Sequence, residues 1–281
     1  MTIIANINRF VGLFFDTLRQ LWRWKIWLLL MTYGLIMFAV LCVHNNPLSP
    51  LFYGIMKLWT SLLNSRDSSR FFHYPGHYLY LTQFFGWAKL VVGVLLEGIF
   101  LGTVALLFRN YFTATRPVLK ESLRSQVNLW RQFVLASCIV NGIITLAGVL
   151  IPQIFSTYLI GYERRLLAFQ LVVMPFVFSV IVALFYSVIP AIAMHRVSFW
   201  RGILFSLKSF AARPFTYLFL SAIILFLPVV FGFLADKSDT IVGKFRPELM
   251  FWILAVGLVG DMISNFFWIG TATRLLIDEK Q

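Results

Sequence analysis

The sequence predicts an all-α, polytopic integral membrane protein with six transmembrane helices and amphipathic interfacial helices. Of its 281 residues, 60% are hydrophobic and 12% are charged, which leaves more apolar surface than one soluble core can bury. Several apolar runs reach about 18 residues, the length at which a helix crosses about 30 Å of hydrocarbon. Lys and Arg gather in short loops between these runs, as is typical of multi-span membrane proteins. We expect residues 1–281 to form a single transmembrane domain.

The N-terminal stretch 8–25 has the spacing of an amphipathic helix that lies on the membrane surface. Phe14 and Leu18 recur one turn apart on its apolar face, and Arg19 lies on its polar face. The apolar run 26–43 follows directly. Because this run is longer than the hydrophobic region of a signal peptide and lacks a small-residue cleavage site, we expect it to be retained as the first span.

Five further apolar runs predict the remaining spans. They cover about 81–108, 132–151, 166–194, 214–234 and 249–273. Pro175 and Pro190 lie inside the fourth span, where each removes a backbone donor and should kink the helix. The apolar segment 51–63 is only about 13 residues long, so it suits a re-entrant or surface helix better than a span.

The distribution of basic residues predicts the orientation. The N-terminal stretch, the basic surface connectors 109–131 and 195–213, and the C-terminal tail hold 15 Lys/Arg against four Asp/Glu. The three other loops hold eight against five. By the positive-inside rule, both termini and both connectors are expected on the cytoplasmic side of the membrane.

A short basic motif recurs and indicates a three-fold parallel internal repeat. Ser122-Leu123-Arg124-Ser125 returns 84 residues later as Ser206-Leu207-Lys208-Ser209, and more loosely as Thr17-Leu18-Arg19-Gln20. An offset of 164 residues places Glu97 on Asp261. The alternative is that the positive-inside rule makes basic connectors look alike in any polytopic protein.

Two acidic residues are expected near the middle of the membrane. Glu97 and Asp261 each lie about a dozen residues from a flanking arginine, and an ionisable group at that depth costs about 2.5–3.5 kcal/mol. The functional hypothesis is a path for protons, ions or polar headgroups. The structural alternative is a protonated acid that hydrogen-bonds Asn141, Ser264 or Asn265 and holds spans together. Lys89 lies about 12 Å along the helix from Glu97, so we expect it to reach the outer surface instead.

The connectors carry candidate lipid- or partner-binding residues. An anionic leaflet attracts each nearby basic residue by about 1 kcal/mol, so these side chains could bind phospholipid headgroups or dock a membrane or cytoplasmic protein. They are Arg116, Lys120, Arg124, Arg131, Arg201, Lys208 and Arg213. The net charge of +13 is explained in this way, and we expect no nucleic-acid partner.

No signature of soluble enzyme chemistry is found. The sequence has no P-loop, G-x-S-x-G, H-E-x-x-H or paired CxxC motif, and Cys42 and Cys138 fall inside apolar runs. His73 and His77 have i, i+4 spacing, but a Pro-Gly pair between them breaks the helix that a shared metal ligand set needs; a turn could still bring them to His44. We predict no catalytic residue, metal or cofactor.

The fourth span, the second connector and the fifth span together resemble a pattern in bacterial multi-span proteins. The family is the YciC type, together with the membrane domain fused to some glycerophosphodiester phosphodiesterases. The matching residues are Pro190, Arg201, Ser206, Leu207 and Lys208. The resemblance covers about residues 80–275 and implies a cytoplasmic-membrane protein. It carries over no catalytic residue, because that phosphodiesterase chemistry resides in a separate soluble domain.

Three functions remain open at this point. The first is a non-enzymatic scaffold or accessory subunit that binds lipid or partner proteins through the basic surface helices. The second is a transporter or permease component that uses Glu97 and Asp261. The third is a membrane enzyme acting on lipid-linked substrates, with His44, His73 and His77 in the outer loop.

Overall fold

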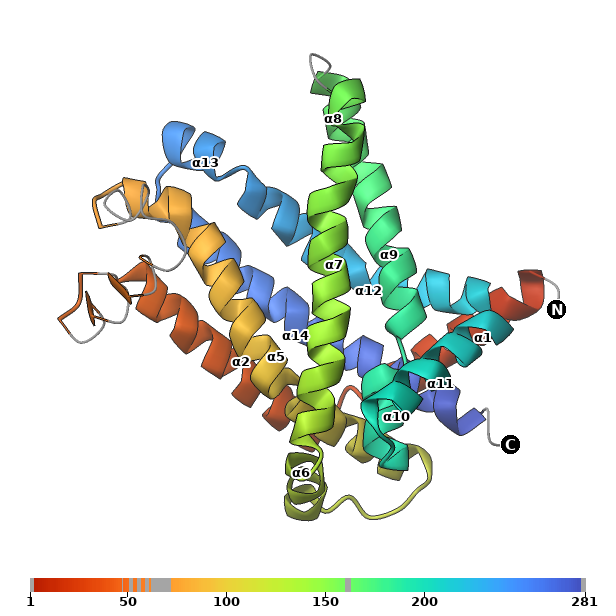
Figure 1. Cartoon of the computed structure of the whole chain (residues 1–281). Helices are drawn as coiled ribbons and strands as arrows, with labels where there is room; N and C mark the ends of the chain where they lie inside the picture. The colour runs from red at the N-terminus through yellow and green to blue at the C-terminus, as the bar shows by residue number, and fades with distance from the viewer. Residues whose placement is uncertain are drawn as a thin grey trace. The chain divides into compact units, whose positions relative to one another are not determined.

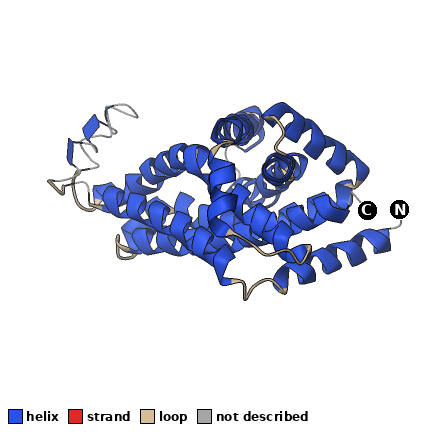
Figure 2. Cartoon of the chain, turned by 90° about the horizontal axis from the view of Figure 1, so that it is seen from below, coloured by secondary structure: helices blue, strands red, loops and turns tan. Residues whose placement is uncertain are grey.

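A computed structural model of the chain describes residues 3–46, 48–50, 53–54, 57–58, 61, 72–159 and 163–278. Within these residues every regular element is a helix, as Figure 2 shows, and none is a strand. The prediction of an all-α protein is confirmed. The segment 51–63, proposed as a re-entrant or surface helix, lies largely outside the described residues.

The helices can be followed along the chain in Figure 1. They are α1 (Ile3–Leu18), α2 (Trp24–Asn45), α5 (Gly76–Phe112), α6 (Leu119–Val127), α7 (Trp130–Leu159), α8 (Glu163–Ala168), the π-helix η1 (Phe169–Val173), α9 (Met174–Phe185), α10 (Val188–His195), α11 (Phe199–Ala212), α12 (Pro214–Asp236), α13 (Ser238–Lys244) and α14 (Leu249–Asp278).

In the part of the chain that the structure describes, six helical segments are long and apolar enough to cross a membrane, which agrees with the predicted number of spans. They are Trp24–Asn45, Gly76–Phe112, Trp130–Ser156, Arg164–His195, Pro214–Asp236 and Leu249–Asp278. The chain is therefore a membrane-spanning protein with its backbone polar groups paired inside helices, as hydrocarbon requires.

Helix ends differ from the predicted ones at one proline and at one turn. The helix predicted to end at residue 151 continues through Pro152 to Leu159, since a proline removes one backbone donor without stopping an apolar helix. The interfacial helix predicted over 8–25 ends at Leu18. Tight turns follow, with Leu21 N–H donating to the Leu18 carbonyl at 3.0 Å.

The turn between α1 and α2 is stabilised by side chains that cap open carbonyls. Trp27 donates its Nε1–H to the Leu21 carbonyl at 2.7 Å. Lys25 donates to the Pro117 carbonyl at 3.2 Å, which ties the turn to the segment before α6. The sequence shows only a continuous amphipathic pattern here, so it could not place this break.

The described chain divides into two compact units where the sequence predicts one domain. The first unit holds residues 1–31, 93–226 and 263–281, and the second holds 32–92 and 227–262. Helices α2, α5, α12 and α14 contribute residues to both units.

The core of the first unit is built from large aromatic side chains and small residues that admit them. Phe108 and Phe266 are fully buried and meet edge to face with ring centroids 5.3 Å apart. Trp27 stacks on Phe266 at 4.9 Å. A Cβ on Gly102 would lie 2.7 Å from the Phe133 ring, so this approach of α5 to α7 requires glycine.

The interior of the second unit is aliphatic and aromatic. Met37 and Leu41 of α2, Leu81 and Phe84 of α5 and Met250 of α14 are almost fully buried. Each helix thus presents one closely packed face to the unit's interior and keeps its other face exposed, which is the pattern of a bundle surrounded by lipid.

Candidate functional site

A charged pair joins two apolar helices of the second unit. Lys89 of α5 and Asp261 of α14 form an ion pair with Nζ and Oδ2 2.5 Å apart. Both residues lie well inside their helices, many residues from either end. The Lys89 side chain is 42% exposed and that of Asp261 24% exposed. The pair is therefore intramembrane by sequence position and open on one side.

Close helix packing positions Asp261. Gly257 and Gly260 lie one turn or less before it on α14, and Phe231 of α12 lies against both glycines. A Cβ on Gly260 would lie 3.1 Å from the Phe231 ring. The next residue, Met262, lies against Gly34 of α2 in the same way. Small residues thus let three helices approach around the acid and restrict its backbone position.

The ion pair corrects one expectation for Lys89. Its predicted position at the outer surface is wrong, because the ammonium group pairs with Asp261 of another helix. Glu97, Asn141 and Asn265 belong to the first unit and are half-buried there. Asp261, one of the two predicted acids, thus has a charged partner on another helix.

The pair is electroneutral and has spare hydrogen-bonding capacity. An ammonium carries three N–H donors and a carboxylate has two acceptor oxygens, so one contact between them uses only part of each group. Neutralising two charges by pairing lowers the cost of keeping them in an apolar region, although desolvation is seldom fully repaid. Chemically the pair can offer a donor cation and an acceptor anion to the same ligand.

The fourth span contains a break that the first unit repairs with polar side chains. Helix α9 ends at Phe185 and α10 begins at Val188. Because Pro190 has no N–H, the carbonyl of Tyr186, four residues earlier, has no helical donor. Trp268 of α14 donates its Nε1–H to that carbonyl at 2.9 Å.

Ser206 of α11 satisfies two further backbone groups at this break. Its hydroxyl donates to the Leu184 carbonyl at 2.8 Å and accepts the Ser187 N–H at 3.1 Å. In an unbroken helix those groups would pair with residues four positions away. The recurring Ser-Leu-Lys-Ser motif thus contributes a buried serine to the break as well as an exposed lysine.

Two side-chain hydrogen bonds complete this cluster. The Tyr186 hydroxyl lies 2.6 Å from the Thr271 hydroxyl, and the Ser187 hydroxyl lies 3.2 Å from that of Tyr217. All four residues are fully buried. Sequence reasoning missed this cluster, whose only signal was Pro190. Because these groups satisfy one another and the backbone, the cluster acts as a structural support.

A second proline explains the π-helix in the same span. In η1 the N–H of Met174 bonds the Phe169 carbonyl, five residues back, immediately before Pro175. The wider turn gives the proline ring room next to the preceding turn. The predicted kinks near Pro175 and Pro190 therefore take the form of a π-helix and a break.

Six of the seven candidate basic residues are exposed. Arg213 is half-buried. The exposed ones are Arg116, Lys120, Arg124, Arg131, Arg201 and Lys208. Large apolar side chains are exposed beside them: Val127 of α6 is 51% exposed and Trp200 of α11 is 60% exposed. The outer faces of these short helices thus combine positive charge with apolar surface.

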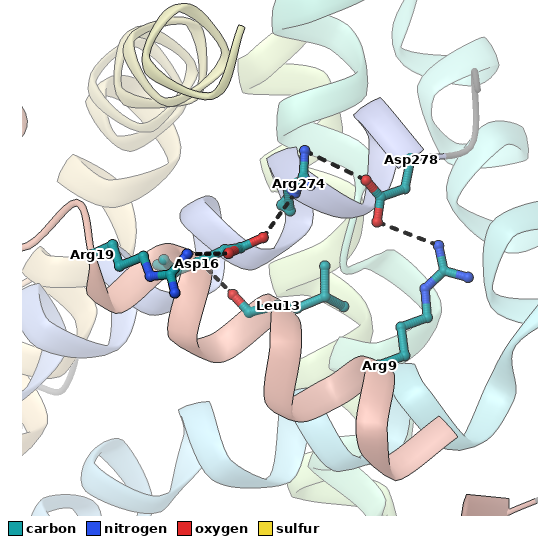
Figure 3. Close-up of polar contacts among 7 residues, drawn as sticks. Arg9, Leu13, Asp16, Arg19, Arg274 and Asp278 are labelled. Atoms are coloured by element: carbon teal, nitrogen blue, oxygen red, sulfur yellow. Dashed lines mark hydrogen bonds and ion pairs between the residues drawn. The ribbon is translucent and has the colours of Figure 1, made fainter. Parts of the chain in front are cut away.

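An ion-pair network ties α1 to the end of α14 (Figure 3). Arg274 contacts Asp16 at 3.2 Å and Asp278 at 3.6 Å, and Arg9 contacts Asp278 at 3.6 Å. The Arg274 guanidinium also lies over the Phe112 ring at 5.7 Å. The network stabilises the position of α1, and sequence analysis did not identify it.

An aromatic and acidic cluster lies at the start of α5 in the second unit. Tyr74 donates its hydroxyl to Glu248 Oε1 at 3.2 Å, and the rings of His77 and Tyr78 lie 3.8 Å apart. Loss of hydration raises the pKa of the Tyr74 phenol, and the Glu248 carboxylate raises it further, so the phenol stays protonated and donates.

The histidines considered in the sequence lie in different environments. His44 is buried, with its Nδ1 2.7 Å from the Val40 carbonyl, whereas His73 is exposed. Among the residues that the structure describes, no three His, Cys, Asp or Glu side chains form a group able to hold a metal ion.

The fold and composition of the described residues define a class, that of a membrane-spanning protein with six long apolar helices and an ion pair between two of them. No protein-family model, curated protein or solved structure matches this sequence. The proposals below therefore start from the chemistry of the chain's own residues.

Proposed function

We propose that this chain is a non-enzymatic multi-span protein that binds anionic phospholipid headgroups, as a scaffold or accessory subunit, through its basic surface helices. The observation that carries this proposal is the shared exposure of basic and apolar side chains on the outer faces of α6 and α11. Such a face suits the boundary between headgroups and acyl chains.

Helix α11 illustrates the arrangement. Trp200, Leu204 and Lys208 follow one another at four-residue spacing and are exposed, with Arg201 beside them. The opposite face carries Ser206, which is buried at the helix break. One face therefore packs on the protein, and the other is available to lipid, where indole and aliphatic groups enter the apolar layer and the basic groups meet phosphates.

Helix α6 and its flanks follow the same arrangement. Lys120 and Arg124 lie one turn apart on its exposed face, and Val127 continues that face. Gln126 is buried on the other side. With both connectors and both termini on the cytoplasmic side, as the positive-inside rule predicts, these faces would meet the anionic inner leaflet of a bacterial inner membrane.

The predicted three-fold repeat belongs to this proposal. Helices α7 and α12 begin at Trp130 and Pro214, which are separated by the same 84 residues as the two serine motifs. The first hydroxyl of each motif, Thr17, Ser122 or Ser206, is buried. These features support three surface helices of one ancestral kind, each leading into a span.

Lipid retention tests the proposal. The variant with Lys120, Arg124, Arg201 and Lys208 changed to Gln is purified in mild detergent beside the wild type. Bound phosphatidylglycerol and cardiolipin are then counted by native mass spectrometry. Because each basic residue near an anionic surface contributes about 1 kcal/mol, anionic-lipid affinity should fall by roughly fivefold for each substitution.

The matched control changes Lys237, Lys244 and Arg246 to Gln, since these residues flank or lie in α13 rather than the connectors. It should retain the wild-type amount of anionic lipid. Equal lipid retention by the connector variant, the control and the wild type would contradict the proposal.

The Lys89–Asp261 pair favours a second candidate, a transport component. An intramembrane ion pair that is partly exposed faces a polar ligand or water more readily than acyl chains, and such residues mark transport paths in other membrane proteins. The test is solute, ion and lipid flux in proteoliposomes. If the wild type supports a flux and the variant with both Lys89 and Asp261 replaced does not, the result supports this candidate. Glu97→Gln is examined separately. The absence of any flux with the wild type would exclude the candidate.

A further inference from the structure

A line of positions on α5 leads from the start of the helix to the ion pair. Tyr78, Thr82, Gly86 and Lys89 are spaced by four, four and three residues, so they share one helix face over about 16 Å. We name these four positions the α5 strip. Three of them are polar and the fourth is glycine, in a span that is otherwise strongly apolar.

The strip is open beside Lys89. Gly86 lies one turn before Lys89 and is exposed, and a Cβ built on it meets no atom within 4 Å. The Lys89 side chain is itself 42% exposed. Nothing in the described second unit therefore covers this face at the level of the ion pair.

The outer end of the strip carries a second acid. Glu248 accepts a hydrogen bond from Tyr74, and the His77 ring lies against that of Tyr78, the first strip position. Glu248 is exposed. Tyr78 itself is buried, so a cationic group arriving from the membrane surface meets the Glu248 carboxylate and the exposed Tyr74 ring first, and then Asp261 at the inner end.

The charge balance of the pair selects the class of ligand. A single ion could replace only one partner and would leave the other charge without compensation, which is strongly unfavourable in an apolar region. A zwitterion replaces both at once. Its ammonium pairs with Asp261 and its phosphate with Lys89, so every charge keeps a counterpart.

The apolar surfaces of α5 and α14 favour an amphiphile over a small solute as the ligand of the pair. Trp87 and Val91 of α5 and Val256 and Val259 of α14 are all more than 40% exposed. They lie two or five residues from Lys89 or Asp261 and therefore on other faces of the two helices, where they give α5 and α14 an apolar surface at the level of the pair. Acyl chains can remain in the hydrocarbon against that surface while the headgroup enters the strip.

We propose that the second unit binds the zwitterionic headgroup of a phospholipid, of the phosphatidylethanolamine kind, at Lys89 and Asp261, and that the α5 strip lets this headgroup pass into the membrane. The inference rests on the transport candidate and names its substrate class. It is independent of anionic-lipid binding at α6 and α11.

Lipid translocation in proteoliposomes tests this proposal. The full chain is reconstituted with phosphatidylethanolamine that carries a fluorophore on an acyl chain and a free headgroup, and dithionite quenches the label in the outer leaflet. Parallel arms use acyl-labelled phosphatidylglycerol and entrapped free phosphoethanolamine. The main variant combines Lys89→Met with Asp261→Leu, which removes both charges without leaving one unpaired.

Two further variants distinguish an effect on the lipid path from an effect on folding. Gly86→Leu fills the open position of the strip without touching the pair, and leucine is a better helix former than glycine. Asp239→Leu with Lys244→Met removes the same charges from exposed positions in α13 and is the matched control.

The expected result is translocation of phosphatidylethanolamine that falls about tenfold in the Lys89→Met/Asp261→Leu variant and also falls in Gly86→Leu, with the control unchanged. Phosphatidylglycerol should cross more slowly than phosphatidylethanolamine in the wild type. Equal rates for the wild type and the Lys89→Met/Asp261→Leu variant overturn the proposal, and so do equal rates for the two lipids.

The remaining outcomes distinguish phospholipid translocation from transport of another solute or ion through the pair. If free phosphoethanolamine crosses and the labelled lipid does not, the phospholipid assignment is overturned while transport through the pair stands. If no lipid, solute or ion crosses with the wild type, both the inference and the transport candidate are overturned.

Discussion

The two units place polar groups inside apolar helices in opposite ways. The first unit buries neutral groups completely, and Ser206 and Trp268 donate to backbone carbonyls at a helix break. The second unit holds two full charges, Lys89 and Asp261, partly exposed and bonded to each other. The first arrangement is needed to form the helix, whereas the second satisfies no backbone group, so the charged pair is the better candidate for function.

The two arrangements should also respond differently to substitution. Removing one charge leaves the other uncompensated, but removing both together is close to neutral. For Ser206 no second substitution of that kind exists, because its partners are the Leu184 carbonyl and the Ser187 N–H, backbone groups that a substitution does not remove. Substitutions at the pair and at the break should therefore differ in whether a second substitution restores stability.

Asp261→Ala should have the largest effect. It leaves the Lys89 ammonium without its partner, and breaking such a pair costs about 3–5 kcal/mol when it is buried, with the lower end expected here because the pair is partly exposed. Unfolding in detergent micelles measures the loss. Lys89→Met combined with Asp261→Leu should recover most of it; equal destabilisation of the single and double variants would contradict the interpretation.

Ser206→Ala should cost about 2 kcal/mol or more, since the Leu184 carbonyl and the Ser187 N–H both lose their partner. The same unfolding assay measures this loss. Ser198→Ala, at an exposed position of the same connector, is the control and should change stability by less than about 0.5 kcal/mol. Similar values for the two serines would show that the break does not depend on Ser206.

Trp268→Phe should cost about 1 kcal/mol through its lost hydrogen bond to the Tyr186 carbonyl. The cost should shrink when Pro190→Ala is also present, because alanine restores an N–H that can reach that carbonyl. A double-mutant cycle of the two substitutions measures this coupling. Strict additivity would disprove the link between Pro190 and Trp268.

Arg274→Gln should have the smallest effect, below about 1 kcal/mol, because its ion pairs with Asp16 and Asp278 are partly exposed. The effect should decrease further at high salt, which screens exposed charges. Thermal unfolding at low and at high sodium chloride measures it. An effect that stays large at high salt would place the role of Arg274 in its contact with Phe112 instead.

The candidate site could be predicted only in part. Asp261 stood out because a charge in a long apolar run is costly wherever the helix packs. Its partner did not, since Lys89 lies 172 residues away and any intramembrane acid or amide could have been chosen. Pro190 likewise predicted a kink, but nothing in the local sequence showed that Trp268 and Ser206 would bond the carbonyls released there.

By itself the sequence determined the class of protein, the six apolar helices and the basic connectors. Hydrocarbon imposes helix length and backbone pairing on each segment separately, so these features can be derived from a local stretch. The packing of the helices determines which polar groups meet, where α1 turns into α2 and where the chain divides into two units. Those outcomes depend on contacts between helices distant in sequence, where small residues set how closely two backbones approach.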